Sequence, residues 1–252
     1  MTRAGQRGSR DRDSGRLQGG ASRHAAPQAG IKPQDSASAE SCLANKVVLD
    51  WDGTVTEVDS LHMVIERFGD REAYVALEAE LGRTLTLDEV IAAEMATIVA
   101  PLDEVVAWLV DNVRIRRGFH ELVAACDPLI VSAGFHETIE PVLRREGVEA
   151  RVVANHVTAD PAGWRAEFAP GAICEVCGER CKRAAVGGLG PFAYVGDGVS
   201  DRCVSLAAER RFARDGLARW LDREGVPYEP FGDLHDVLAA LADPTASSPP
   251  GP

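Results

Sequence analysis

Two aspartates that lie one residue apart, directly behind a short apolar run, constrain the fold of this chain more than any other feature. The run Lys46-Val47-Val48-Leu49 is rich in β-branched side chains and predicts a buried strand. Asp50 and Asp52 follow it, and Gly53 permits a sharp turn. Open α/β sheets bind ligands at the carboxyl ends of their strands. Two carboxylates at that position favour a catalytic pair, in which one group attacks and the other transfers a proton.

Apolar periodicity after residue 45 predicts strands that alternate with helices. This alternation is typical of an α/β fold, with a mostly parallel sheet covered by helices on both faces. The predicted strands cover residues 46–50, 128–132, 151–154, 192–195, 210–213 and 227–230. The predicted helices cover residues 117–126, 135–146, 181–187, 200–208, 215–224 and 233–242.

A mostly helical segment, residues 59–115, separates the first two predicted strands. Within it, residues 75–81, 87–95 and 102–110 have amphipathic helical patterns. We therefore expect a core made of residues 43–58 and 116–242, with residues 59–115 inserted after the first strand as a small helical cap. Residues 157–168 break the alternation and predict a hairpin with a Pro/Gly turn.

The two ends of the chain have a different composition from the rest. Residues 1–42 and 243–252 contain few large apolar side chains, so they cannot bury enough surface to offset the entropy of ordering. We predict that both are disordered tails.

Three more polar features come where a parallel sheet would place them beside the paired aspartates. Ser132-Ala133-Gly134 ends the second predicted strand, Lys182 begins a helix, and the run from Gly196 to Asp201 follows another strand. Each has a purely structural alternative, since Ser132 and Asp201 could simply cap helices and Asp52 could cap a turn. Their common location at one edge of the sheet favours a joint functional role.

These four motifs, in this order, resemble the haloacid dehalogenase superfamily of phosphohydrolases. The resemblance covers about residues 46–240, and the helical insertion is similar to the cap of the phosphoserine-phosphatase-like branch, subfamily IB. It implies a Rossmann-like core and a Mg²⁺-dependent phosphomonoesterase.

The resemblance also assigns roles to residues. Asp50 is implied as the nucleophile that forms an aspartyl-phosphate, and Asp52 as the general acid and base. Ser132, together with backbone N–H groups of Ala133 or Gly134, would hold the phosphate, and Lys182 would balance its charge. Asp59, at an offset where relatives place an acid against the substrate, could equally be a helix N-cap.

Mg²⁺ is the implied cofactor, because it prefers oxygen ligands and would reduce the repulsion between the nucleophile and a phosphate dianion. Its ligands would be Asp50, the backbone carbonyl of Asp52, Asp197 and, directly or through water, Asp201.

Segments from Cys181 onward narrow the choice of candidate substrates. Cys181-Lys182, residues 212–217 and residues 227–231 are similar to methionine-salvage phosphatases that act on 2-hydroxy-3-keto-5-methylthiopentenyl-1-phosphate. The Cys-Lys stretch is also similar to phosphoethanolamine/phosphocholine phosphatases. Phosphoserine is the alternative, although Ser200 stands where phosphoserine phosphatases usually have Asn. Arg67, Arg71 and Arg83 are candidate carboxylate partners. A scaffold that binds a phosphometabolite without turnover, and phosphotransfer to an acceptor other than water, are further hypotheses.

Three cysteines, Cys174, Cys177 and Cys181, precede Lys182 with Cys-x₂-Cys-x₃-Cys spacing, which is typical of structural Zn²⁺ sites. His156 is the candidate fourth ligand, and free thiols or a labile disulfide are the alternatives. Cys203 is expected to be an ordinary small apolar residue.

Charge and hydropathy restrict the partners. The formal net charge of −12 argues against nucleic-acid binding, which requires clustered Lys and Arg. No apolar run approaches the roughly 20 residues of a membrane span, and the N-terminus has no apolar signal segment. We expect a cytoplasmic enzyme whose partner is a small phosphorylated metabolite.

Overall fold

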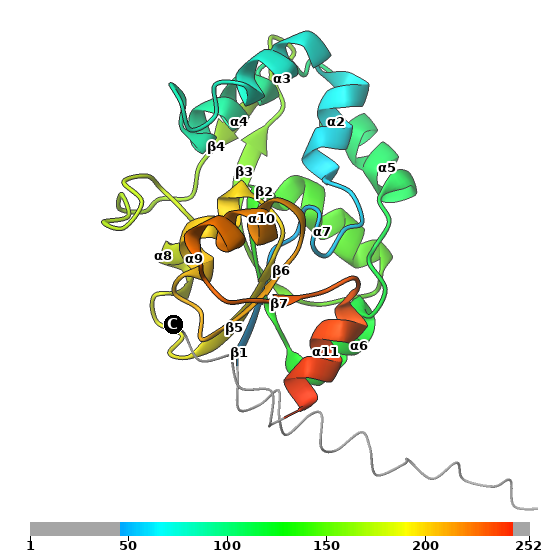
Figure 1. Ribbon diagram of the computed structural model, residues 1–252. Helices are drawn as coiled ribbons and strands as arrows, with labels where there is room; N and C mark the ends of the chain where they lie inside the picture. The colour runs from blue at the N-terminus through cyan, green and yellow to red at the C-terminus, as the bar shows by residue number, and fades with distance from the viewer. Residues whose placement is uncertain (1–45, 244–252) are drawn as a thin grey trace, which may run out of the picture. The chain divides into compact units, whose positions relative to one another are not determined.

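A seven-stranded sheet forms the centre of the computed structural model, which describes residues 46–243 (Figure 1). The strand order is β4-β3-β2-β1-β5-β6-β7, and every pairing is parallel except that of β3 with β4. The strands are β1 (Lys46–Leu49), β2 (Leu129–Phe135), β3 (Arg151–Thr158), β4 (Arg165–Glu167), β5 (Phe192–Gly196), β6 (Arg210–Ala213) and β7 (Glu229–Pro230). The predicted α/β class and mostly parallel sheet are confirmed.

Helices fill most of the connections between these strands. The insertion between β1 and β2 contains α2 (Ser60–Phe68), α3 (Arg71–Glu78), α4 (Leu87–Met95) and α5 (Leu102–Asn112), at the top of Figure 1. The others are α6 (Phe119–Cys126), α7 (His136–Arg145), α8 (Arg183–Val186), α9 (Arg202–Ser205), α10 (Asp215–Glu224) and α11 (Leu234–Ala242), with a 3₁₀ turn η1 (Val199–Asp201). None of these described helices has the length and apolar character that a bilayer-spanning segment needs. The tails predicted at residues 1–42 and, apart from Asp243, 243–252 lie outside the described residues.

The side chains of β1 alternate between two apolar layers, as the period of a strand requires. Val47 and Leu49 face one layer, which includes buried residues of α6, α7 and α11. Val48 faces the other layer, together with Val186 of α8 and Val204 of α9. A strand buried on both faces is continuously apolar, which explains the run that precedes Asp50.

The strand order reverses beside β1, and this reversal fixes the position of the candidate site. The chain proceeds from β1 to β2 and β3 on one side, and later returns to β5 on the other side. Connections that leave β1 and β5 therefore diverge and open a crevice at the carboxyl ends of these strands. Asp50 follows β1 and Asp197 follows β5.

The β3–β4 hairpin packs against the insertion, a contact that the sequence pattern does not indicate. The Trp164 backbone N–H donates to the carbonyl of Ile98 at 3.0 Å, and its indole Nε1 donates to the carbonyl of Ala100 at 2.8 Å. Trp164 is buried. Gly163 has a φ of +128°, and a Cβ added there would lie 2.3 Å from the carbonyl oxygen of Ala96.

This contact predicts that alanine substitution destabilises the protein more at Gly163 than at Gly147. Gly163→Ala should lower the free energy of unfolding by about 3 kcal/mol, because it combines left-handed strain with a backbone clash. Gly147→Ala is the matched control, since Gly147 also has a positive φ, +67°, but no atom lies within 4 Å of its added Cβ. It should cost about 1 kcal/mol. Urea unfolding measures both, and equal losses would contradict the proposed close approach.

Candidate active site

Asp50 lies at the end of the central strand and is paired with a buried lysine. Its backbone N–H donates to the carbonyl of Val195 at 2.9 Å, which ties it to β5. Only 4% of Asp50 is exposed. The Nζ of Lys182 donates to Asp50 Oδ1 and, at 2.7 Å, to Asp201 Oδ1. The structure thus brings together the first, third and fourth motifs.

Three carboxylates form a compact cluster around this point. Asp50, Asp197 and Asp201 each offer an oxygen, and these oxygens all lie within 4.8 Å of one another. Desolvation and then the charge of Asp201 raise the pKa of Asp50 to about 7. Desolvation and then the charge of Asp50 raise the pKa of Asp197 to about 8. All donors in this cluster are oxygen atoms, and the negative charge of the three carboxylates exceeds the positive charge of Lys182. Such a set fits a hard divalent cation such as Mg²⁺.

Asp201 is held rigidly by donors on three sides. Its Oδ2 accepts the backbone N–H groups of Asp197 and Gly198 at 2.8 and 2.9 Å, and its Oδ1 accepts the hydroxyl of Tyr194 at 2.6 Å. Burial raises the pKa of Asp201, but the positive charge of Lys182 and the hydrogen bonds from Lys182, Tyr194 and Gly198 together outweigh burial and lower the pKa below its ordinary value. Tyr194 is a site residue that sequence reasoning missed, because a buried strand tyrosine has no distinguishing pattern.

Asp52 lies apart from the carboxylate cluster and is oriented by the insertion. Its Oδ1 accepts the backbone N–H of Ser60 at 2.9 Å and also the hydroxyl of Ser60, at the start of α2. A Cβ placed on Gly134 would lie 3.1 Å from Asp52 Oδ2 and 3.2 Å from Ser132 Oγ. The carboxyl end of β2 therefore approaches Asp52, as the sequence predicts. Ser60 was not predicted.

Ser132, Ala133 and Gly134, at the carboxyl end of β2, face Asp52. Ser132 is buried, and its Oγ accepts the backbone N–H of Gly134 at 2.8 Å. Asn155 of β3 donates to the carbonyl of Ala133 at 2.8 Å and fixes this end of the strand from the other side. Asn155 also lacks a sequence signal, because only the β2–β3 pairing places it here.

Asp59 caps a helix, and Thr54 fixes the turn. The Asp59 side chain accepts the backbone N–H of His62 at 2.8 Å, which makes it the N-cap of α2. Thr54 Oγ1 donates to Asp197 Oδ1 at 2.9 Å. Gly53 has a φ of +75°, and a Cβ there would lie 2.4 Å from Asp197 Oδ2. The Gly-Thr pair thus lets Asp197 approach the turn closely.

Arg116 braces the turn after β1 and was also missed by sequence reasoning. The side chain is buried. Its Nε donates to the carbonyl of Thr54 at 2.8 Å, and its Nη2 donates to those of Gly53 and Thr56 at 2.7 and 3.1 Å. One guanidinium therefore satisfies several carbonyls that have no strand partner.

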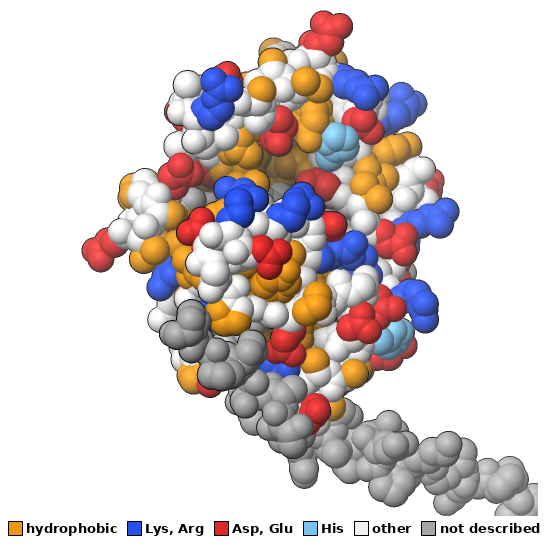
Figure 2. All heavy atoms as spheres, viewed as in Figure 1, with side chains coloured by type: hydrophobic (Ala, Val, Ile, Leu, Met, Phe, Trp, Pro, Cys, Tyr) orange, Lys and Arg blue, Asp and Glu red, His pale blue; other side chains and the backbone are white. Residues whose placement is uncertain are grey.

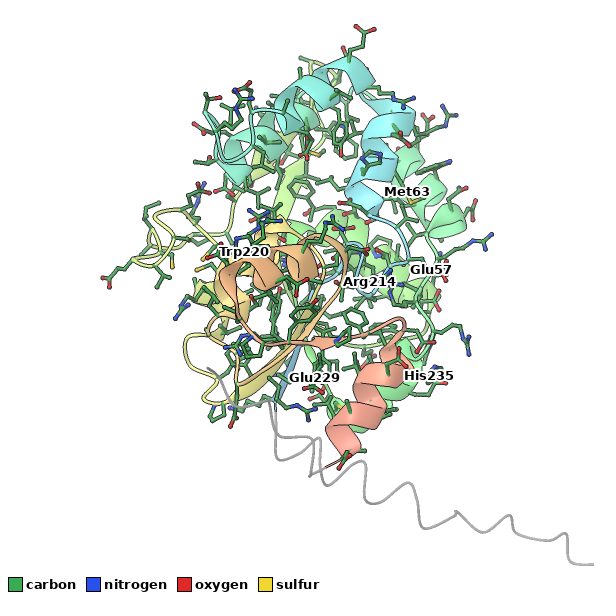
Figure 3. All side chains as sticks on the ribbon, viewed as in Figure 1. Glu57, Met63, Arg214, Trp220, Glu229 and His235 are labelled. Carbon is green, nitrogen blue, oxygen red and sulfur yellow. The ribbon has the colours of Figure 1, made fainter. Side chains whose placement is uncertain are left out.

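A cavity of about 780 Å³ adjoins Ser132, Ala133 and Lys182. Figure 2 shows the hollow between the insertion helices, at the top of the view, and the core below, with hydrophobic side chains inside. Its lining includes Leu87 of the insertion and Trp220 of α10, which is labelled in Figure 3. Further apolar lining residues are Leu81, Val131, Val153, Phe168, Val176, Val199 and Leu206.

The structure places the predicted cysteines together and adds a fourth, but it corrects the expected histidine. Cys174, Cys177 and Cys181 lie close to Cys203, which is buried, as expected for a small apolar residue, and which the sequence did not connect with the other three. His156 does not belong to this cluster. Its Nδ1 lies 2.7 Å from Glu137 Oε1, because β3 directs the residue toward α7.

The sequence matches the haloacid dehalogenase-like hydrolase family over residues 47–205, more than half of the chain. The chain belongs to this family, which confirms the family predicted from the motifs.

Sequence relatives and solved structures point to phosphatases. A 2-hydroxy-3-keto-5-methylthiopentenyl-1-phosphate phosphatase of Bacillus mycoides is 26% identical over 213 residues, covering 78% of this chain and 95% of the relative. One of Bacillus thuringiensis subsp. konkukian is 25% identical with the same coverage. A phosphoserine phosphatase from T. onnurineus has the same fold, with a TM-score of 0.60 and 16% identity, over 79% of this chain and 94% of its own. A substrate-bound phosphoserine phosphatase also gives 0.60 and 16%, over 77% and 97%.

The brace formed by Arg116 can be tested against its exposed neighbour. Arg116→Lys keeps the charge but replaces several donors by one ammonium, so it should lower the free energy of unfolding by about 2–3 kcal/mol. Arg117→Lys, at an exposed position, should change it by less than about 0.5 kcal/mol. Denaturant titration measures both variants. Equal stabilities would show that the turn does not depend on the guanidinium.

Proposed function

We propose that this chain is a Mg²⁺-dependent phosphomonoesterase that acts through an aspartyl-phosphate on Asp50. One observation carries the proposal. Asp50 is buried at the carboxyl end of the central strand, and both an ammonium group and two further carboxylates lie within contact range. Family membership and the phosphatase relatives support the same reaction.

In the first step, an oxygen of Asp50 attacks phosphorus, and the bond from phosphorus to the leaving oxygen breaks. Asp52 gives its proton to that leaving oxygen. In the second step, water attacks the aspartyl-phosphate, Asp52 accepts a proton from this water, and inorganic phosphate leaves. The hydrogen bonds from Ser60 hold the Asp52 carboxyl beside the loop of Ser132, where it can reach the leaving group.

The other predicted residues neutralise and orient the phosphate. Lys182 supplies a buried positive charge next to Asp50, and Ser132 with the N–H groups of Ala133 or Gly134 would bind phosphate oxygens. Asp50, Asp197, Asp201 and the backbone carbonyl of Asp52 would hold Mg²⁺. When bound, the ion offsets the negative charge of the carboxylates and of the substrate. We propose that Asp59 faces the bound substrate in addition to capping α2.

The helical insertion is proposed to act as a cap. Its two connections to the core pair with each other, because Thr56 and Ile115 form an antiparallel bridge. Its Leu81 and Leu87 line the cavity. A cap of residues 59–115 on a core of residues 43–58 and 116–242 would exclude water from the bound phosphate ester. Location in the cytoplasm stays a prediction.

The substrate is proposed to be a small phosphorylated metabolite with an uncharged, partly apolar tail. The apolar lining of the cavity supports this, and so do the relatives named for a methylthiopentenyl phosphate. The arginines considered as partners for a phosphoserine carboxylate, Arg67, Arg71 and Arg83, are all exposed, and none belongs to the cavity lining.

An ester of an amino alcohol, such as phosphoethanolamine or phosphocholine, is the second candidate. Glu78 lines the cavity, and Glu94 is only 3% exposed, with an Oε1 that has no hydrogen-bond partner among the described residues. The carboxylate of Glu78, in the cavity lining, would suit a cationic tail.

Loss of the nucleophile should abolish hydrolysis. Asp50→Asn should lower kcat/KM for p-nitrophenyl phosphate by at least about 10³-fold, because amide oxygen is a poor nucleophile. Asp103→Asn, an exposed acid in the first turn of α5, should leave it unchanged. EDTA should remove wild-type activity, and added Mg²⁺ should restore it. Activity that survives both the substitution and the chelator would disprove the mechanism.

A substrate panel with Mg²⁺ distinguishes the two tails and the phosphoserine alternative. We expect kcat/KM for the methylthiopentenyl phosphate to exceed that for phosphoserine by at least about 10²-fold. A zwitterionic tail would lose hydration against the apolar side chains of the cavity, while Arg180 and Asp88 of the lining already pair with each other at 2.7 Å. Preference for phosphoethanolamine would favour the second candidate instead. Preference for phosphoserine would contradict the proposed substrate class, and folded protein inactive on the whole panel would favour a binding scaffold.

A further inference from the structure

Four cysteines from two separate segments converge beside the active site. Cys174, Cys177 and Cys181 lie on the segment between β4 and α8, and Cys203 lies in α9. Their sulfur atoms all lie within 4.8 Å of one another. All four are free thiols. Their convergence does not follow from sequence spacing, because residues 182–202 lie between the Cys174–Cys181 stretch and Cys203.

The sulfur–sulfur separations suit a metal rather than a disulfide. Cys174 Sγ and Cys203 Sγ are 3.7 Å apart. A tetrahedral Zn²⁺ with bonds of about 2.3 Å to sulfur places its ligands about 3.8 Å apart. A disulfide would need about 2.05 Å. The cluster thus has the dimensions of a closed four-thiolate site.

The backbone around Cys174 has the form of a metal-binding knuckle. The N–H of Gly178 donates to the carbonyl of Cys174 at 2.8 Å, and the N–H of Cys174 donates to that of Glu179 at 2.9 Å. Gly178 has a φ of +76°, which lets the chain reverse directly after Cys177. Backbone N–H groups of Cys177 and Val176 also point to the Cys174 sulfur.

This segment has no regular secondary structure. Residues 168–181 contain no helix or strand, and Ile173 and Val176 are 62% and 59% exposed. Phe168 at its start packs against the core and Arg180 near its end pairs with Asp88 at 2.7 Å, while the cysteines between and beside them lie close to Cys203 of α9. A metal ion bound by thiolates would stabilise such a loop, and the cysteine side chains are already arranged to bind one.

We propose that Cys174, Cys177, Cys181 and Cys203 bind one structural Zn²⁺. Each thiol releases its proton on binding, and four protein ligands leave no open position for a substrate or water. The site differs from the carboxylate cluster in ligand chemistry, since thiolates select soft or borderline ions and Mg²⁺ prefers oxygen.

The site would position two active-site residues from outside. Cys181 directly precedes Lys182, and Cys203 follows Asp201 by two residues. Lys182 and Asp201 form the buried ion pair at 2.7 Å. A zinc ion that joins the two segments would fix the positions of Lys182 and Asp201 relative to each other. Hydrogen bonds to the ligands of a metal centre orient those ligands in a similar way.

Metal analysis of the full chain tests the proposal. Protein purified with zinc under reducing conditions and dialysed against Mg²⁺ should contain about one zinc per chain. Cys203→Ser and Cys177→Ser should each lower zinc content at least about tenfold. Cys177 is exposed, so its variant should fold, and circular dichroism checks this. His156→Ala, which removes the ligand expected from the sequence, should keep full zinc content.

A second readout identifies the ligands. Substitution with Co²⁺ should give thiolate charge-transfer and tetrahedral d–d bands in the wild type and lose them in Cys203→Ser. Asp50→Asn should be inactive yet keep its zinc, which separates this proposal from the proposed mechanism. Wild type without zinc, a disulfide between these cysteines in reduced protein, or full zinc content in Cys203→Ser would overturn the proposal.

Discussion

The buried contact of Lys182 with Asp50 and Asp201 is the interaction on which the rest of the site depends. Burying one ammonium and two carboxylates is costly unless each charge is paired and hydrogen-bonded. Burial lowers the pKa of Lys182, but the charges of Asp201 and Asp50 outweigh it and raise the pKa above its ordinary value. The lysine therefore stays charged, while a bound cation, as proposed, would offset the remaining negative charge of Asp50, Asp197 and Asp201.

The fold meets this requirement by bringing distant segments to one edge of the sheet. Asp50 follows β1, Ser132 lies in β2, Lys182 precedes α8, and Asp197 follows β5. Parallel strands place these carboxyl ends together, and the reversal of strand order beside β1 opens room for a ligand. Contacts outside the reacting groups hold them there. Arg116 braces the turn after β1, and the cysteine cluster lies between the segments of Lys182 and Asp201.

Sequence reasoning predicted the sheet and the four motifs because strands end in polar residues at recognisable offsets. It delimited α10 at residues 215–224, as observed. It did not delimit α2, which has a short amphipathic pattern, and it missed Tyr194, Arg116, Asn155 and Ser60. Arg116 and Asn155 act through contacts between segments far apart in the chain, and Tyr194 and Ser60 through turns whose geometry a local apolar pattern does not encode. For the same reason it chose His156 over Cys203, since only folding brings α9 to the cysteine loop.

The central claim is that Asp50 itself becomes phosphorylated during turnover. The most direct measurement is rapid acid quenching of the full chain during turnover with Mg²⁺, followed by mass spectrometry of its peptides. The account predicts a phosphoryl group on the peptide that contains Asp50, absent from Asp50→Asn. A phosphoryl group on another residue, or steady turnover with none on the protein, would contradict it.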